Sequence, residues 1–301
     1  MKKIILIGLL FLNGVVKGQQ DPLYSQYLFN PFIINPAYAG YSKDLNALAA
    51  YRLQWAGFEG APVTMNASGH VALHSNRMGL GLTLLKDNIG SDKTTMIQGS
   101  YAYHLLLDNN QRISFGLNAG FVNYSMDYST LKIDESDPKF QTNISEFKPT
   151  VGAGILFSSD RFFIGLSVPK MLKSSTNVDG AQVILYNQHL YAHLAYLFTL
   201  SSRLKLKPFV LARAVQGSPV NLDAGVSLHA DDSYTLGLFT RSLHTFGFLA
   251  KINLGDVLRL GYVFELPTNQ SVGMNYTSHE ITLGIRMRLL RFHDIAAVTD
   301  F

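Results

Sequence analysis

The feature that most constrains this chain is a strict alternation of apolar and polar residues between Ser233 and Leu290. A period of two places alternate side chains on opposite faces of a β-strand. We therefore predict four successive strands that share one continuous apolar face, opposite a face of glycine, threonine and charged residues. The apolar series is Tyr234, Leu236, Leu238, Phe246, Phe248, Ala250, Ile252, Leu254, Leu258, Leu260, Tyr262, Phe264, Leu266, Ile281, Leu283, Ile285, Met287 and Leu289.

Two architectures can cover such an apolar face. In a soluble sandwich it packs against a second sheet, whereas in an outer-membrane barrel it contacts lipid and the polar face lines a lumen. With 15% charged residues, 12% aromatic residues and 25 glycines, the composition favours the barrel. The chain has no cysteine, which excludes both disulfides and a lipoprotein anchor.

The same pattern predicts about fourteen strands of about 8 to 15 residues, which matches the strand length and even strand number of outer-membrane barrels. Pro208 lies inside one of these segments and lacks an amide hydrogen, so it predicts a bulge or a break in pairing. The predicted strands are 44–54, 63–73, 77–87, 93–107, 112–126, 148–158, 161–168, 186–199, 203–214, 220–230, 233–242, 245–254, 256–266 and 278–290.

The connections between these strands alternate in length. Every second one is a tight polar turn, and the others include the long segments 55–62, 127–147, 169–185 and 267–277. Short periplasmic turns and longer outer loops are typical of outer-membrane barrels. We therefore predict an all-β fold consisting of a single transmembrane antiparallel β-barrel. Both ends of the barrel chain are expected in the periplasm, with 127–147 and 169–185 pointing outside the cell.

The start of the chain resembles a cleaved signal peptide. Lys2 and Lys3 precede a short apolar run, and a small residue precedes the predicted cut between Gly18 and Gln19. Removal of three lysines leaves 25 − 3 = 22 basic against 21 acidic residues, so the basic balance does not indicate nucleic-acid binding. The predicted organisation is a signal peptide over 1–18, an irregular segment over 19–43, a barrel over 44–290 and a tail over 291–301.

The segment 19–43 has no period and is punctuated by prolines, which excludes a long helix or a ladder strand. It is nevertheless richer in aromatic residues than a flexible linker. We predict that it packs inside the barrel mouth or on the periplasmic rim. Its Asn-Pro blocks either form a rigid plug that leads into the first strand or dock a periplasmic partner. The candidate residues for either role are Asn30, Pro31, Asn35, Pro36, Ala37, Tyr38 and Gly40.

Charged residues fall on the polar face of the predicted strands. They can form an internal lattice of ion pairs that fills the barrel, or line a basic pore that selects anions. The aromatic amino-terminal segment needs a place to pack, which favours the filled barrel. The main candidates are Arg52, Arg213, Arg241, Lys251, Arg259, Glu265, Glu280 and Arg286, with Asp223 and Arg288 on the same face.

Signs of catalysis or metal binding are weak. His189 and His193 share one face of a predicted strand, but at about 3.3 Å per residue they lie too far apart for one metal ion. The run from Gly225 to His229 fails the serine nucleophile motif at its last position. A hydrolase assembled from neighbouring strands is a remote alternative. We expect no enzyme activity and no cofactor.

Several motifs resemble the PorP/SprF family of outer-membrane proteins, which belong to the type IX secretion and gliding machinery. The resemblance covers most of the chain, and its most specific parts are the amino-terminal Asn-Pro blocks and a closing Ser-His-Glu. The motifs are the runs 20–27, 30–31, 35–40, 51–55, 60–64, 79–81, 87–90, 114–117, 165–167, 240–242 and 278–281.

This resemblance implies a non-enzymatic outer-membrane protein that supports export or surface anchoring of a large cargo protein. Its expected contacts are outer-membrane lipid, a secreted adhesin-like type IX cargo on the outer face, and a periplasmic lipoprotein. The alternative function is a passive porin or transporter for small solutes, which the barrel fold alone would equally allow.

Overall fold

The computed structural model describes residues 25–42, 44–73, 76–126, 144–178, 181–268 and 276–287. The predicted signal peptide, most of the predicted 127–147 loop, Arg288 and the predicted tail lie outside these residues. Within them, no helix has the length and apolar character needed to cross a membrane.

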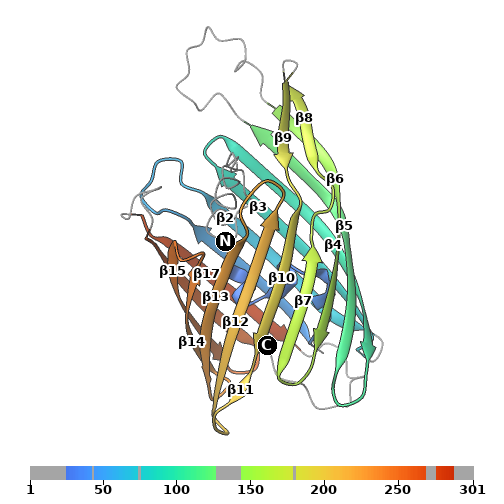
Figure 1. The fold of residues 1–301 in the computed structure, drawn as a ribbon, viewed down its shortest axis with the longest axis vertical. Coiled ribbons are helices and arrows are strands. Elements are labelled where there is room, and N and C mark those ends of the chain that lie inside the picture. The colour runs from blue at the N-terminus through green and yellow to red at the C-terminus, as the bar shows by residue number, and fades with distance from the viewer. Residues whose placement is uncertain are drawn as a thin grey trace, which may run out of the picture.

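The described strands form a closed antiparallel barrel of fourteen strands, which confirms the predicted fold class (Figure 1). The barrel closes where β10 pairs with β12, and the first and last strands, β1 and β17, pair along their length. β11 is a two-residue continuation of β10. The barrel strands are β1 (Leu45–Leu53), β2 (Val63–Leu73), β3 (Met78–Ile89), β4 (Asp92–Leu106), β5 (Arg112–Met126), β6 (Ile144–Ser158), β7 (Phe162–Val168), β10 (His189–Tyr196) with β11 (Phe198–Thr199), β12 (Leu204–Val215), β13 (Asn221–Ala230), β14 (Tyr234–Arg241), β15 (Thr245–Leu254), β16 (Leu258–Pro267) and β17 (Ser278–Met287).

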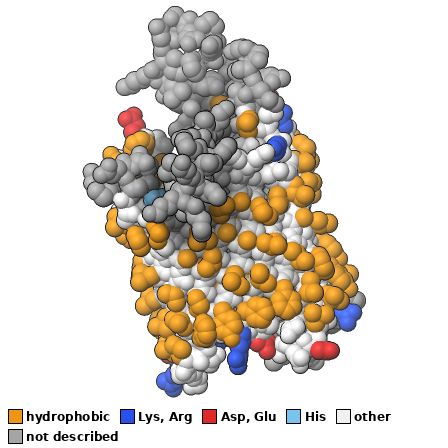
Figure 2. Space-filling view, in the orientation of Figure 1, with side chains coloured by type: hydrophobic (Ala, Val, Ile, Leu, Met, Phe, Trp, Pro, Cys, Tyr) orange, Lys and Arg blue, Asp and Glu red, His pale blue; other side chains and the backbone are white. Residues whose placement is uncertain are grey.

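Period-two patterning determines which side chains face outward. Leu117 and Leu238 each expose 63% of their surface on the outer wall, whereas Glu280 on the inner wall is fully buried. Figure 2 shows hydrophobic side chains covering the wall, with charged ones gathered at its ends. No second sheet covers this wall in the described part of the chain, so the sandwich alternative is wrong. Lipid is the medium that suits such a surface.

If the outward face contacts lipid, a charge placed on it should destabilise the barrel. Phe248→Arg on β15 places a charge on the lipid face, and near the membrane midplane we expect a loss of about 2–4 kcal/mol in the free energy of unfolding. Lys251→Ala, on the inner face of the same strand, should cost far less. Urea unfolding from lipid vesicles, followed by the fluorescence of the single tryptophan, measures both. Equal losses would mean that the two faces had been inverted.

Two prolines explain irregularities in strand pairing. At Pro208 the β10–β12 ladder stops after Ala195 pairs with Phe209, and it resumes where Phe198 pairs with Leu206, so the predicted break is present. Pro149 lies in β6, which begins four residues earlier than the predicted strand, at Ile144. Pairing of β6 with β7 starts only at Ala153, so Pro149 falls where no β7 partner needs its missing amide hydrogen.

The connection between β7 and β10 differs from the predicted outer loop. Its middle forms a hairpin of β8 (Ser174–Val178) and β9 (Ala181–Tyr186), which projects beyond the barrel rim (Figure 1). The two ends of the connection, near Pro169 and Tyr186, turn toward the barrel interior. Gln98 donates a hydrogen bond to the Pro169 carbonyl at 3.2 Å. Tyr186 is buried in a cluster with inward-facing side chains of β3, β4 and β5, namely Leu85, Met96, Val122 and Tyr124. The connection therefore covers part of the outer mouth.

The amino-terminal segment lies inside the barrel. It forms three single-turn 3-10 helices, η1 (Ser25–Leu28), η2 (Pro31–Ile33) and η3 (Pro36–Tyr38). The prolines start η2 and η3, where a missing amide hydrogen costs nothing. The segment extends deeper than a mouth or rim position, because Ser25 contacts Glu280 near the outer end of β17. We call residues 25–42 the lumen segment.

Candidate functional site

The outer half of the lumen segment is held by a network of buried charges. Arg52 binds Glu265 at 2.6 Å and Glu280 at 3.4 Å. Arg241 binds Glu265 at 3.3 Å and Asp223 at 3.2 Å. The network thus places two arginines among three carboxylates that come from β13, β16 and β17. All three carboxylate side chains are at most 3% exposed.

The lumen segment supplies additional donors to this network. The Ser25 amide donates to Glu280 at 2.8 Å, and its hydroxyl donates to Glu265. The Tyr27 hydroxyl donates to Asp223 at 2.8 Å. Burial and this neighbouring carboxylate hold the pKa of Tyr27 well above its usual range, so the phenol remains a neutral donor. Buried carboxylates are stable only when paired and hydrogen-bonded, so the network and the segment depend on each other.

Two asparagines attach the middle of the segment to the wall. Asn30 donates to the Ser68 hydroxyl at 2.8 Å. The Asn35 side chain accepts from the Ala37 amide at 2.9 Å, which caps η3, and donates to the Ile155 carbonyl at 3.2 Å. One short side chain therefore both starts the turn at Pro36 and binds it to β6.

The end of the segment fits against glycines on β3, β5 and β6. A Cβ atom on Gly116 would lie 2.1 Å from the Ala37 amide nitrogen, and one on Gly79 would lie 1.9 Å from the Ala39 carbonyl oxygen. Gly40 has a φ of +68°, and a Cβ there would lie 2.5 Å from the Gly79 Cα. His104 contacts the Ala39 carbonyl at 2.9 Å. Only glycine allows such close backbone contact at these positions.

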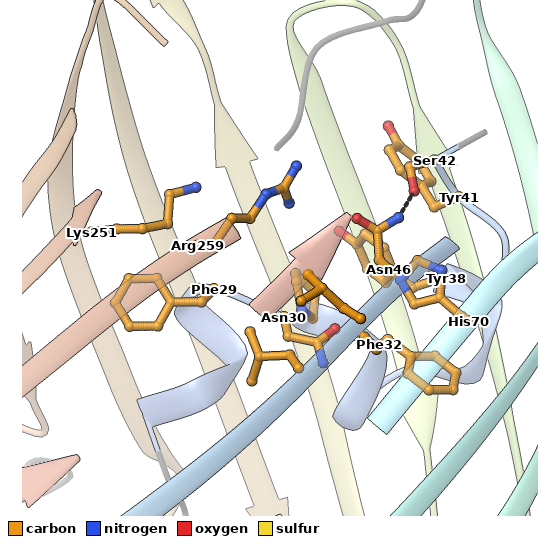
Figure 3. Close-up of a pocket in the computed structure, with 14 residues that line it drawn as sticks. Phe29, Asn30, Phe32, Tyr38, Tyr41, Ser42, Asn46, His70, Lys251 and Arg259 are labelled. Atoms are coloured by element: carbon orange, nitrogen blue, oxygen red, sulfur yellow. Dashed lines mark hydrogen bonds between the residues drawn. The ribbon is translucent and has the colours of Figure 1, made fainter. Parts of the chain in front are cut away.

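The other predicted lumen charges lie apart from this network. Arg286 pairs with Asp44 at the periplasmic end, and Arg213 is buried on the inner face of β12. Lys251 and Arg259 line a pocket between the lumen segment and the wall (Figure 3). The predicted lumen charges are therefore distributed over several places on the inner wall rather than gathered in one network.

His189 and His193 both face the lumen from β10, where they are buried. The His193 ring lies edge-on to Phe163, with ring centroids 4.7 Å apart, and the His189 Nδ1–H donates to the Asn187 carbonyl at 2.9 Å. No cluster of side chains suited to a metal ion occurs within the described ranges.

Trp55 lies in the β1–β2 loop near Phe58.

Sequence reasoning missed the partners that the lumen segment itself contributes, Ser25 and Tyr27, and the glycines that receive it. The positions of the glycines in the sequence could have indicated this contact. Gly79, Gly116 and Gly154 lie toward the periplasmic ends of their strands, and each adjoins the lumen segment. Glycine in a strand interior often marks close approach of another backbone. Nothing in the sequence around Ser25 and Tyr27 indicates their contacts with the buried carboxylates in the same way.

Solved structures resemble this chain only distantly. A Pseudomonas aeruginosa FadL homologue has a TM-score of 0.48 at 11% identity and covers 91% of this chain and 96% of its own. The Acinetobacter baumannii outer membrane protein Omp33 has a TM-score of 0.47 at 9% identity, covering 83% and 100%. The P. putida toluene transporter TodX has a TM-score of 0.47 at 10% identity, covering 88% and 95%. No conclusion about ligands follows from them.

No curated protein matches the chain. The sequence profile of the family described as "Type IX secretion system membrane protein PorP/SprF" matches residues 16–285. This range includes the lumen segment and nearly all of the closed barrel, which is the architecture of an outer-membrane protein. The chain therefore belongs to the PorP/SprF family of type IX secretion system membrane proteins.

Proposed function

We propose that this protein is a non-enzymatic outer-membrane component that supports export or surface anchoring of a large cargo protein. The observation that carries this proposal is the lumen segment. It binds β13, β16 and β17 at one end and packs on β3, β5 and β6 at the other, so it spans the barrel interior. A barrel filled in this way suits docking and anchoring better than passage of solutes.

The outer end supports the same proposal. The β7–β10 connection covers part of the mouth and raises the β8–β9 hairpin above it, so the outer face offers a built surface to a secreted adhesin-like protein. The periplasmic end of the lumen segment and the turns at that end of the barrel would face a periplasmic lipoprotein. Membership of a type IX secretion family supports association with the secretion machinery and its cargo, and neither proposed partner requires transport through this barrel.

Planar-bilayer recording tests the proposal directly. The purified full-length protein should give no steady open-pore current, because the lumen segment occupies the interior. Mild-detergent extracts of the native membrane should in parallel yield a co-purifying secreted protein that carries a type IX sorting domain. A large, stable current without such a protein would instead support the porin alternative.

A further inference from the structure

Among the described strands, the outer end of β6 has a neighbour on one side only. β6 pairs with β5 along all of its 15 residues, from Ile144 to Ser158. Its pairing with β7 covers only Ala153 to Ser158, because β7 has 7 residues and ends at Val168 (Figure 1). On the other side of the long strands the wall shortens gradually, from 12 residues in β3 to 11 in β2 and 9 in β1. The wall therefore has an abrupt step where β6 extends beyond β7.

The alternation of hydrogen bonds along β6 identifies which backbone groups face this step. Met171, just beyond β7, donates its amide hydrogen to the Val151 carbonyl at 2.7 Å, so the backbone groups of Val151 point away from β5. Alternate residues of an antiparallel strand bond to opposite sides, so Pro149, Phe147 and Ser145 point the same way as Val151. None of these three has a backbone partner on that side in the described part of the chain. The step thus presents a row of unpaired amide and carbonyl groups in strand spacing.

The β8–β9 hairpin does not fill this position. Among the described strands β8 pairs only with β9, and it reaches β6 through a side chain, since the Thr176 hydroxyl donates to the Glu146 carboxylate at 2.6 Å. Glu146 lies on the same inward face as the buried Thr150, so the hairpin stands on the lumen side of β6 and leaves its edge open. Unpaired strand edges do not occur against hydrocarbon. This part of β6 therefore lies above the lipid, within reach of molecules outside the cell.

The side chains beside the edge define what an added strand must offer. On the outward face Phe147 is 66% exposed and stacks on Phe121, with ring centroids 4.9 Å apart. On the inward face Lys148 pairs with Glu146 at 2.9 Å. A segment whose apolar residues alternate with polar ones would match both faces. Pro149 lacks an amide hydrogen, so the added ladder must be short, which also protects the edge from extended pairing.

We propose that this edge binds an extended segment of the secreted cargo by strand addition, so that the main chain of the segment continues the sheet beyond β6. The assignment to cargo rests on the proposed function, and strand addition is the mode of docking. A polypeptide offers the regular series of donors and acceptors that an open edge requires, whereas a lipid does not. Main-chain hydrogen bonds would supply affinity, and the alternating side chains beside Phe147 and Lys148 would supply specificity.

A defined peptide tests the edge independently of the cargo. The probe is an acetylated, amidated peptide of alternating valine and threonine with a lysine at each end, added to the full-length protein in neutral detergent. The control peptide is N-methylated at every valine and threonine, which removes its amide donors. We expect saturable binding that protects the Ser145 and Phe147 amides from hydrogen–deuterium exchange, and binding of the control at least about tenfold weaker. Absence of saturable binding, or equal binding of the control, overturns the proposal.

Two substitutions at one position separate the backbone from the side chain. Ser145→Pro removes one edge amide hydrogen, whereas Ser145→Ala removes the hydroxyl and keeps that hydrogen. We expect Ser145→Pro to weaken peptide binding about two- to tenfold, as for the loss of one hydrogen bond, and Ser145→Ala to leave it nearly unchanged. Each variant is first checked for heat-modifiable migration, which reports a folded barrel. Equal affinity of the two folded variants overturns the proposal.

The same pair of variants separates strand addition from the proposed function. Cargo that co-purifies with Ser145→Ala but is lost from Ser145→Pro supports strand addition. Equal retention by both overturns strand addition and leaves the proposed function standing. Peptide binding without any co-purifying cargo contradicts the proposed function and overturns the assignment of the edge to cargo. A dimer in detergent that only Ser145→Pro dissociates would assign the edge to a second copy, and would likewise overturn the proposal.

Discussion

Replacing Arg52 with methionine is expected to lower the free energy of unfolding by about 3–5 kcal/mol, the usual cost of breaking a buried ion pair. Arg52 is 2% exposed and is shared by Glu265 and Glu280. Methionine fills similar space but leaves Glu280 without its arginine, in a site where water cannot take its place. The loss should therefore exceed that of any surface charge in the protein.

Urea titration from lipid vesicles, with Trp55 fluorescence as the signal, measures this loss. Arg203→Met is the matched control, because Arg203 pairs with Asp231 at 3.8 Å in an exposed turn. Exposed pairs contribute at most about 1 kcal/mol. If the two variants lost the same stability, the buried network would not be what holds the lumen segment in place.

Replacing Gly116 with valine is expected to displace the lumen segment and open the barrel. The new Cβ would lie 2.1 Å from the Ala37 backbone nitrogen, and neither backbone can move away without breaking the β5 ladder or the η3 turn. Displacement of the segment is the least costly relief. We therefore expect a steady conductance in planar bilayers that the unmodified protein does not show.

The control for this experiment is Gly99→Val. Gly99 lies on the outward face of β4, where a Cβ would meet nothing nearer than the Ala119 carbonyl oxygen at 3.9 Å. This variant should remain closed. A closed Gly116→Val barrel that still protects residues 25–42 from protease would show that the segment adapts, and that its fit to the glycines is not what seals the lumen.

Period-two patterning was sufficient to predict the strand number and the two faces. The alternation along a single strand assigns each side chain to a face, whichever strands are its neighbours. Pro208 likewise marked a local break that the structure contains. The β8–β9 hairpin was missed because its first strand, Ser174–Val178, is polar and pairs only with its neighbour in the described chain. A hairpin above the rim needs no apolar face, so no alternation marks it.

The candidate site was predictable only in part, for a related reason. Alternation places Arg52 and Glu265 on the inner face, but 213 residues separate them, and pairing across a lumen depends on barrel geometry. The lumen segment posed a harder problem, since its contacts arise from caps, carbonyl groups and bare glycine backbone. These interactions leave little trace in composition or period.

The strands of this barrel differ greatly in length. β4, β5 and β6 have 15 residues each, whereas β14 has 8. At about 3.3 Å per residue these are lengths of about 50 and 26 Å, so the two sides cannot reach the same height above the bilayer. The rim is consequently slanted, with the hairpin standing on its tall side. A molecule on the cell surface would find the mouth sheltered from one direction and approachable from the other, over β14 and its neighbours.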